Sequence, residues 1–161
     1  MSGCFGNMIN QSFSWWCFEK RGVEPVALLA GAAKIGYTGV DLIEEALWPM
    51  VEGFGLSISA VNGHKSIEDG LNRRENAERI ENELRGSIAK ARQWKIPVLI
   101  CFSGNRAGMS DDAGLQQCAE TLGRVAGVAA DACPATEATR LGAVAGIWAI
   151  PLFDRAMVEA C

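Results

Sequence analysis

Apolar and polar positions along the first 132 residues alternate between strand-like and helix-like stretches four times. The apolar run from residue 8 to residue 18 is rich in aromatic side chains, which predicts a strand that ends around Trp16. A helix is predicted from Pro25 to Ile35, because proline suits the first helical turn and Gly36 can end the helix in a left-handed conformation. These elements form the first strand–helix unit.

The second and third strands are predicted at residues 37–43 (YTGVDLI) and 56–61 (LSISAV). Between them, a short helix is expected from about residue 46 to residue 54, ended by Gly55. The second unit therefore repeats the order of the first.

A longer polar loop, residues 62–70, follows the third strand. Asn72 is expected to cap the next helix, with Glu75 three positions further on. Apolar residues spaced for one helical face predict this helix from about residue 73 to residue 93. The third unit thus has a long connection at the carboxyl end of its strand.

The fourth strand is predicted at residues 97–102 (PVLICF), a continuous apolar run typical of a parallel strand that is buried on both faces. After the polar residues 103–106, Asp111 and Asp112 are expected to cap a helix that ends near Asp131.

Four such units in series imply parallel strands with right-handed crossovers, in an open doubly wound sheet or a β/α barrel. The dinucleotide-binding pattern G-x-G-x-x-G does not follow the first strand, and the sequence contains no P-loop. Nucleotide binding is therefore disfavoured. In both folds, ligands bind at the carboxyl ends of the strands.

The composition excludes several functional classes. The formal net charge is −4 and no basic patch stands out, so we expect no nucleic-acid partner. No apolar run approaches the roughly 20 residues of a membrane span, and no secretory signal is visible, so a cytoplasmic protein is expected. The six cysteines form no C-x-x-C pair and the sequence has one histidine, which disfavours a zinc site.

Four segments together resemble the hydroxypyruvate isomerase family, within the xylose-isomerase-like TIM barrels that include sugar phosphate isomerases and epimerases. They are residues 36–42 (GYTGVDL), 62–64 (NGH), 66–72 (SIEDGLN) and 100–106 (ICFSGNR). The resemblance covers about residues 8–132. It implies that residues 1–132 are the N-terminal half of a (β/α)₈ TIM barrel, with about four βα units and the active site at the carboxyl ends of its strands.

The chemistry that the resemblance implies is aldose–ketose interconversion, here of hydroxypyruvate to tartronate semialdehyde or of a similar small hydroxy-carbonyl substrate. A proton next to a carbonyl is removed and returned to the neighbouring carbon, which requires a base and a group that stabilises the enediolate. In the family, two glutamates from the later strands move the proton. Full-length relatives can hold a divalent metal such as Mg or Mn there.

Residues 133–161 depart from the family pattern and are interpreted as a divergent tail. A fifth strand with a catalytic glutamate is expected after Ala132, but neither Glu137 nor Glu159 matches it. The apolar stretch LGAVAGIWAIPLF predicts an irregular tail or a helix up to Ile150. A frameshift or premature stop is the preferred hypothesis. No catalytic residue, metal ligand or cofactor is assigned to this chain, which is expected to be inactive alone.

Two candidate substrate-binding residues follow strands three and four. His64 can contact a substrate carboxylate or hydroxyl group, or it can bond to loop backbone and order the loop. Arg106 can bind an anionic substrate with its planar fork of donors, or form an ion pair with Asp111 or Asp112. The sequence leaves both alternatives open.

Four further positions complete the candidate site. Ser103 and Asn105 can donate hydrogen bonds beside Arg106. Glu44, at the end of strand two, can orient a substrate or have a structural role. Trp16 can wall a sugar pocket or pack in the core, since strand alternation turns only one of Trp15 and Trp16 inward.

Two other functions remain open. The chain can be a non-catalytic half-barrel that self-associates by pairing strands one and four, and binds a small hydroxy acid; this hypothesis predicts a homo-oligomer. It can also be an open α/β sheet that binds a partner through residues 141–153.

Overall fold

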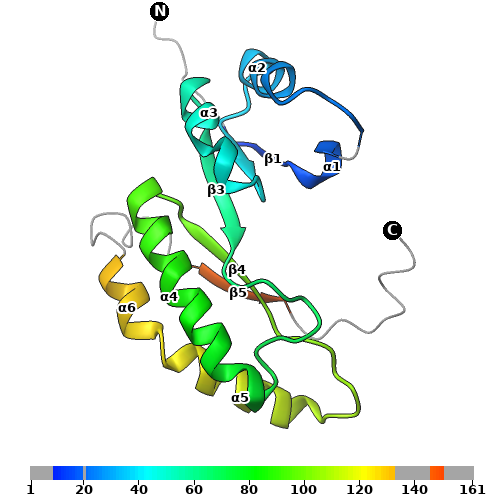
Figure 1. Ribbon diagram of the computed structural model, residues 1–161, viewed down its shortest axis with the longest axis vertical. Coiled ribbons are helices and arrows are strands. Elements are labelled where there is room, and N and C mark those ends of the chain that lie inside the picture. The colour runs from blue at the N-terminus through cyan, green and yellow to red at the C-terminus, as the bar shows by residue number, and fades with distance from the viewer. Residues whose placement is uncertain (1–8, 20, 133–145, 151–161) are drawn as a thin grey trace, which may run out of the picture. The chain divides into compact units, whose positions relative to one another are not determined.

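The architecture is that of parallel strands with intervening helices. The structure is a computed structural model that describes residues 9–19, 21–132 and 146–150. The strands follow one another in the order β1-β2-β3-β4-β5, and β1 with β2, β2 with β3, and β4 with β5 pair in parallel. This α/β arrangement is that of a partial TIM barrel, as the sequence predicts. The chain divides into two compact units, within residues 1–60 and 61–161 (Figure 1).

The first unit has a small apolar core. Its elements are β1 (Ser12–Ser14), α1 (Trp16–Glu19), α2 (Pro25–Ile35), β2 (Gly39–Asp41), the 3₁₀ helix η1 (Glu45–Leu47), α3 (Trp48–Gly53) and the start of β3 (Ser57–Asn62). Leu29 of α2, Val40 of β2 and Val51 of α3 are fully buried. Trp48 is also buried, and its indole Nε1 donates to the carbonyl of Ile43 (3.1 Å).

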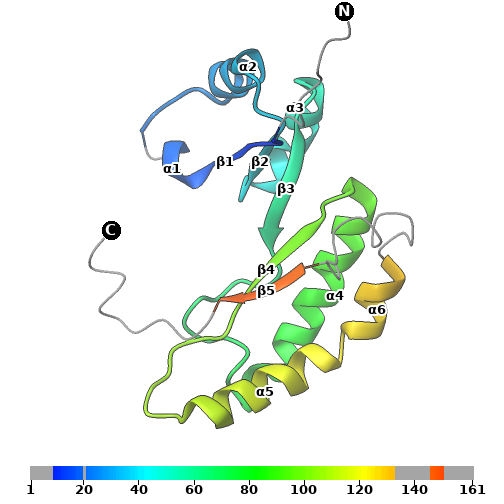
Figure 2. The ribbon, with the colours of Figure 1, turned by 180° about the vertical axis from the view of Figure 1, so that it is seen from behind.

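The second unit is built around one long helix. It contains the 3₁₀ helix η2 (Arg74–Asn76), α4 (Ala77–Trp94), β4 (Val98–Phe102), α5 (Asp111–Gly123), α6 (Ala126–Ala132) and β5 (Gly146–Ile150). Helix α4 buries Ile80, Leu84 and Ile88 along one face. It packs on β4, and α5 and α6 pack on it in turn (Figure 2). The predicted amphipathic helix therefore has the role that its pattern indicates.

The predicted helix at residues 25–35 is confirmed in detail. Pro25 lies in its first turn, and Gly36 ends it with φ 99°. The Gly36 and Tyr37 amides donate to the carbonyls of Ala33 and Ala32, which closes the helix end. Strands β3 and β4 also agree with their predicted ranges to within one residue at each end.

The first strand is shorter than predicted, which is a correction. The amide of Trp15 donates to the carbonyl of Asp41 (3.0 Å), and after that the amides of Phe18 and Glu19 turn back to the carbonyl of Trp15. Trp16 therefore lies in helix α1 rather than at the end of a strand. Met8, where the predicted strand starts, lies outside the described residues.

Asn72 does not cap a helix, contrary to the prediction. It is fully buried, and its Nδ2 donates to the carbonyl of Asn105 (2.9 Å). The η2 turn that leads into α4 follows Arg73, which makes no capping hydrogen bond with its side chain. A buried tertiary hydrogen bond takes the place of the local one that the sequence pattern indicates.

The cap of α5 is Ser110 rather than Asp111 or Asp112. The Ser110 Oγ accepts a hydrogen bond from the amide of Ala113 (3.3 Å), while the two aspartates occupy the first turn, where negative charge is favourable. The predicted single helix is also interrupted between Gly123 and Ala126, so α5 and α6 are separate.

The tail contributes a strand. Residues 146–150 form β5, which pairs in parallel with β4 along its whole length, from Val98 with Gly146 to Phe102 with Ile150. The expectation of an irregular or helical tail is therefore wrong for this segment, because the sequence GIWAI, with two isoleucines and a tryptophan, suits a strand. The rest of the tail lies outside the described residues. Among the helices that are described, none is long and apolar enough to cross a membrane.

Candidate functional site

The loops that leave β3 and β4 are joined to each other by backbone hydrogen bonds. We call residues 63–73 the β3 loop and residues 103–110 the β4 loop. The amides of Leu71 and Asn72 donate to the carbonyls of Phe102 (3.0 Å) and Ser103 (2.8 Å), and the amide of Asn105 donates to Glu68 (2.8 Å). The carboxyl-terminal edge of this unit is thereby fixed in one geometry.

Two glycines allow the loops to approach closely. A Cβ atom on Gly70 would lie 2.3 Å from the Gly104 nitrogen and 2.4 Å from the Phe102 oxygen. A Cβ on Gly104 would lie 2.5 Å from Asn72 Oδ1, and Gly104 also has a φ of 97°, which favours glycine. The glycines in the motifs SIEDGLN and ICFSGNR therefore have a packing role.

His64 bonds to the backbone of β4. Its side chain is 2% exposed, and its Nε2 accepts a hydrogen bond from the amide of Phe102 (2.9 Å). The proton of the neutral ring is therefore on Nδ1, which is buried and has no hydrogen-bond partner. Burial lowers the pKa of His64 and Arg79 adds to this effect, while Glu83 opposes it. This geometry favours the loop-ordering alternative.

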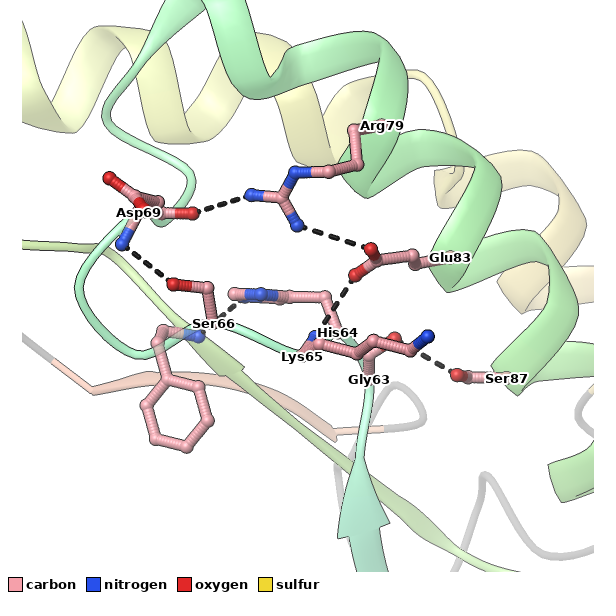
Figure 3. Close-up of polar contacts among 9 residues, drawn as sticks. Gly63, His64, Lys65, Ser66, Asp69, Arg79, Glu83 and Ser87 are labelled. Atoms are coloured by element: carbon pink, nitrogen blue, oxygen red, sulfur yellow. Dashed lines mark hydrogen bonds and ion pairs between the residues drawn. The ribbon is translucent and has the colours of Figure 1, made fainter.

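The Arg79–Glu83 ion pair on α4 also forms hydrogen bonds to the β3 loop (Figure 3). Arg79 donates to Glu83 Oε1 (3.2 Å) and to the carbonyl of Asp69 (2.7 Å), and the amide of Lys65 donates to Glu83 Oε2 (2.9 Å). Burial alone would raise the pKa of Glu83, but the bonds from Lys65 and Arg79 outweigh it and lower that pKa. The hydroxyl of Ser87 adds a bond to Gly63 O (2.9 Å).

The three candidates on the β4 loop have different environments. Arg106 forms an exposed ion pair with Asp111 (2.5 Å), the structural alternative that the sequence left open. Ser103 is buried, and its carbonyl is bonded to the β3 loop. Asn105 is exposed, and its carbonyl accepts from Asn72 and from Arg73 (3.3 Å). Together with His64, these residues lie at one strand edge of the second unit.

Trp16 and Glu44 belong to the first unit, so the structure does not assemble all six candidates within one unit. Trp16 is 58% exposed on α1, whereas Trp15 is 3% exposed. Trp15 is therefore the inward residue of the pair. Glu44 is exposed and precedes η1. Their substrate-binding roles stay predictions.

Asp41, the last residue of β2, was missed by the sequence reasoning. Its Oδ1 is buried and has no hydrogen-bond partner, and the same is true of Ser59 Oγ on β3. The available signal was the pattern GVD, in which an acidic residue ends a short strand on the face opposite the buried valine.

The described residues do not fit a resident metal ion. No three His, Cys, Asp or Glu side chains among them gather closely enough to hold one. Cys101 is buried within β4, and burial raises the pKa of its thiol to about 12, so it is a packing residue rather than a nucleophile. What the strand edges can do chemically is donate and accept hydrogen bonds and present charge.

Comparison with known proteins supports the fold. No protein-family model matches the chain, and no curated protein matches it. Among solved structures, it is similar to a sugar phosphate isomerase/epimerase from Parabacteroides distasonis ATCC 8503, with a TM-score of 0.60 and 15% sequence identity. The match covers 76% of this chain and 48% of that one, so the chain spans about half the length of the other protein. At this identity the likeness concerns the fold, and it agrees with the xylose-isomerase-like resemblance.

Proposed function

We propose that the chain carries part of the substrate site of a sugar isomerase that interconverts an aldose and a ketose through an enediolate, with hydroxypyruvate as the first candidate substrate. The observation that carries this proposal is the fold shared with a sugar phosphate isomerase/epimerase over 76% of the chain. The resemblance in the NGH, SIEDGLN and ICFSGNR segments supports it, because the β3 and β4 loops stand where TIM-barrel enzymes bind substrate.

In this proposal, the loop residues orient the substrate. Arg106 is exposed, and exchanging Asp111 for a substrate carboxylate would retain a charge-assisted hydrogen bond. Ser103 and Asn105 supply polar groups at the same edge, and His64 positions the loop by its bond to Phe102. Glu44 and Trp16 are the candidates from the first unit. The carboxylates that transfer the proton are not assigned to any described residue, and no step is routed through a metal.

Deuterium exchange tests the proposal with the full chain. Formation of an enediolate replaces the C3 hydrogens of hydroxypyruvate with deuterium from the solvent, which proton NMR measures in D₂O with and without added Mg²⁺ or Mn²⁺. Because no described residue is assigned as the proton-transferring base, the expected result for this chain alone is a hydroxypyruvate-induced thermal shift; protein-dependent exchange, followed by tartronate semialdehyde, would show that the chain also supplies the base. Exchange that is equal with and without the protein, together with no ligand-induced thermal shift, would overturn the proposal.

One outcome separates catalysis from binding. A thermal shift with hydroxypyruvate but no exchange shows binding without catalysis by this chain, and the non-catalytic half-barrel that binds a small hydroxy acid predicts the same result. Light scattering on the same sample then tests whether that form self-associates.

A further inference from the structure

The carboxyl end of β2 carries an aspartate, Asp41, whose Oδ1 has no hydrogen-bond partner in the described chain. Asp41 Oδ1 and Ser59 Oγ are both buried and lack a hydrogen-bond partner, and both residues belong to the first unit. A buried oxygen without a partner loses its hydration and gains nothing in return, which is unfavourable by about 1–3 kcal/mol. Such groups require an explanation, and an absent ligand is one that the position supports.

Strand register brings three polar side chains to the same end of the sheet. A Cβ on Gly39 would lie 3.2 Å from Ser57 Oγ and 3.5 Å from Ser12 Cβ, so these positions share one face. The register partner of Asp41 on β1 is Ser14, two residues beyond Ser12. Asp41 is likewise two residues beyond Gly39, on the same face.

On β3, a register shift after Val40 makes Ala60 the partner of Asp41 and leaves Ser59 directly before that partner. The opposite face carries Val40 and Ile58, which are 0% and 3% exposed in the core. Ser14 and Asp41 therefore lie opposite the packed face, at the ends of β1 and β2, and Ser59 lies within β3 next to the register partner of Asp41.

The backbone beside Asp41 is strained. Leu42 has φ 55°, a left-handed conformation that is unfavourable for leucine by about 1–2 kcal/mol. It is held by the bond from its amide to the carbonyl of Ala60 (2.9 Å), while Trp15 donates to the Asp41 carbonyl. Strained residues of this kind concentrate at functional sites. Here the strained residue, Leu42, directly follows Asp41, the last residue of β2.

The side chains at the carboxyl end of β2 favour an uncharged ligand. A carboxylate only accepts hydrogen bonds, and a serine hydroxyl donates or accepts one, so hydroxyl groups are their complement. Residues 41–45 hold three acidic side chains, Asp41, Glu44 and Glu45, and no basic one, which repels an anion.

We propose that Asp41, with Ser14 and Ser59, forms a subsite for the hydroxyl groups of an uncharged sugar. This inference rests on the proposed isomerase function and refines its substrate class. An aldose or ketose without a phosphate or carboxylate at this end is the ligand that the subsite accepts. An anionic group is excluded from it.

Binding of two probes to the full-chain protein tests the subsite. D-fructose is the uncharged probe and hydroxypyruvate the anionic one, each titrated by calorimetry. Asp41→Asn should weaken D-fructose binding about tenfold, because a charge-assisted hydrogen bond is lost. It should leave hydroxypyruvate binding unchanged or tighter, since a negative charge is removed. Ser59→Ala should weaken D-fructose binding by a smaller factor.

Glu52→Gln is the matched control, because it removes one exposed carboxylate from the same unit, on α3. It should leave the affinity for both probes unchanged. Circular dichroism of each variant checks its fold, so that a general loss of structure, which would weaken both probes equally, is recognised.

The outcomes separate this inference from the function on which it rests. Hydroxypyruvate binding without D-fructose binding, or D-fructose binding that Asp41→Asn does not change, overturns the subsite and leaves the isomerase proposal standing. Equal weakening of both probes by Asp41→Asn also overturns the subsite. If neither probe binds, both proposals fail.

Discussion

The strand ends of the two units differ in how their polar groups are used. In the second unit, polar side chains fasten loops: His64 bonds to β4, Asn72 bonds to the β4 loop, and Arg79 joins α4 to the β3 loop. In the first unit, Asp41 at the end of β2 and Ser59 within β3 have buried oxygens without a partner. Buried polar atoms without a partner occur in both units, His64 Nδ1 and Asn72 Oδ1 being those of the second, but there the other polar atom of each side chain bonds to the neighbouring strand or loop.

This difference shows where a family-like motif is informative. Most of the NGH, SIEDGLN and ICFSGNR segments lie in the second unit, where glycines and polar side chains are explained by loop packing. Their resemblance therefore agrees with the fold, and the fourth family-like segment, GYTGVDL of the first unit, contains Asp41, whose Oδ1 has no partner.

The largest expected effect is at the closest contact between the loops. Gly70→Ala places a Cβ 2.3 Å from the Gly104 nitrogen, and only backbone surrounds it. The free energy of unfolding should fall by about 3 kcal/mol, because the loops must separate. Urea unfolding followed by circular dichroism measures this loss. Gly86→Ala on α4 is the control, since nothing lies within 4 Å of its Cβ, and it should be neutral or stabilising by about 0.5–1 kcal/mol. Equal stability of the two variants would contradict the fixed-loop interpretation.

Loss of the His64 ring should have the next largest effect. His64→Leu leaves the Phe102 amide buried without an acceptor, which should lower the free energy of unfolding by about 2 kcal/mol. His64→Gln can restore an acceptor and should recover part of this loss. Hydrogen exchange of the Phe102 amide is the direct measurement. Unchanged protection of that amide in His64→Leu would show that the bond is not stabilising.

Acid should weaken the second unit through the same residue. The folded pKa of His64 is lowered by burial from its ordinary value of 6.5, so the unfolded chain binds the proton more readily. The stability that the neutral ring contributes is complete above pH 6.5 and is lost as the pH falls through the folded pKa. Urea midpoints of the wild-type protein should decrease below pH 6.5, and His64→Gln should flatten this dependence. An identical slope in both proteins would exclude His64 as its cause.

A smaller effect of opposite sign is expected at Asp41 in the first unit. Asp41→Asn removes the charge of a half-buried carboxylate whose buried Oδ1 has no hydrogen-bond partner in the described chain, so it should raise the free energy of unfolding by up to about 1 kcal/mol. Glu52→Gln, in which the carboxylate is exposed, should change it by less than about 0.5 kcal/mol. Thermal and urea unfolding measure both. Clear destabilisation by Asp41→Asn would show that the carboxylate supports the fold, and the contrast between the two units would disappear.

The sequence predicted the elements well where local signals and packing agree. Pro25 and Gly36 bound α2 as expected, and the apolar stripe of α4 is its buried face. The capping prediction failed at Asn72, because the pattern does not reveal that the carbonyl of Asn105, 33 residues away, will bind the side chain. The prediction of an irregular or helical tail failed at residues 146–150, because pairing with β4 decides between a helix and a strand there.

The candidate site was predicted only in part, for a related reason. The sequence places His64, Ser103, Asn105 and Arg106 at strand ends, and the structure confirms that position. It could not decide whether these residues bind substrate or neighbouring backbone, since that depends on distances between the loops. For the same reason Asp41 was indistinguishable from any polar residue at the end of a strand, until its lack of a partner was seen.

Replacing Arg106 should have the smallest effect on stability. It is also the most direct test of whether a side chain of the second unit binds substrate. Its ion pair with Asp111 joins side chains that are 55% and 69% exposed, so Arg106→Met should change the free energy of unfolding by no more than about 0.5 kcal/mol. If Arg106 binds a substrate carboxylate, the same variant should weaken hydroxypyruvate binding about tenfold, because a charge-assisted bond is lost. Arg124→Met, which breaks another exposed ion pair of the same unit, should have a similarly small effect on stability and should leave hydroxypyruvate binding unchanged. Unchanged affinity in Arg106→Met would mean that Arg106 does not bind the substrate carboxylate, and that its ion pair with Asp111 is its role.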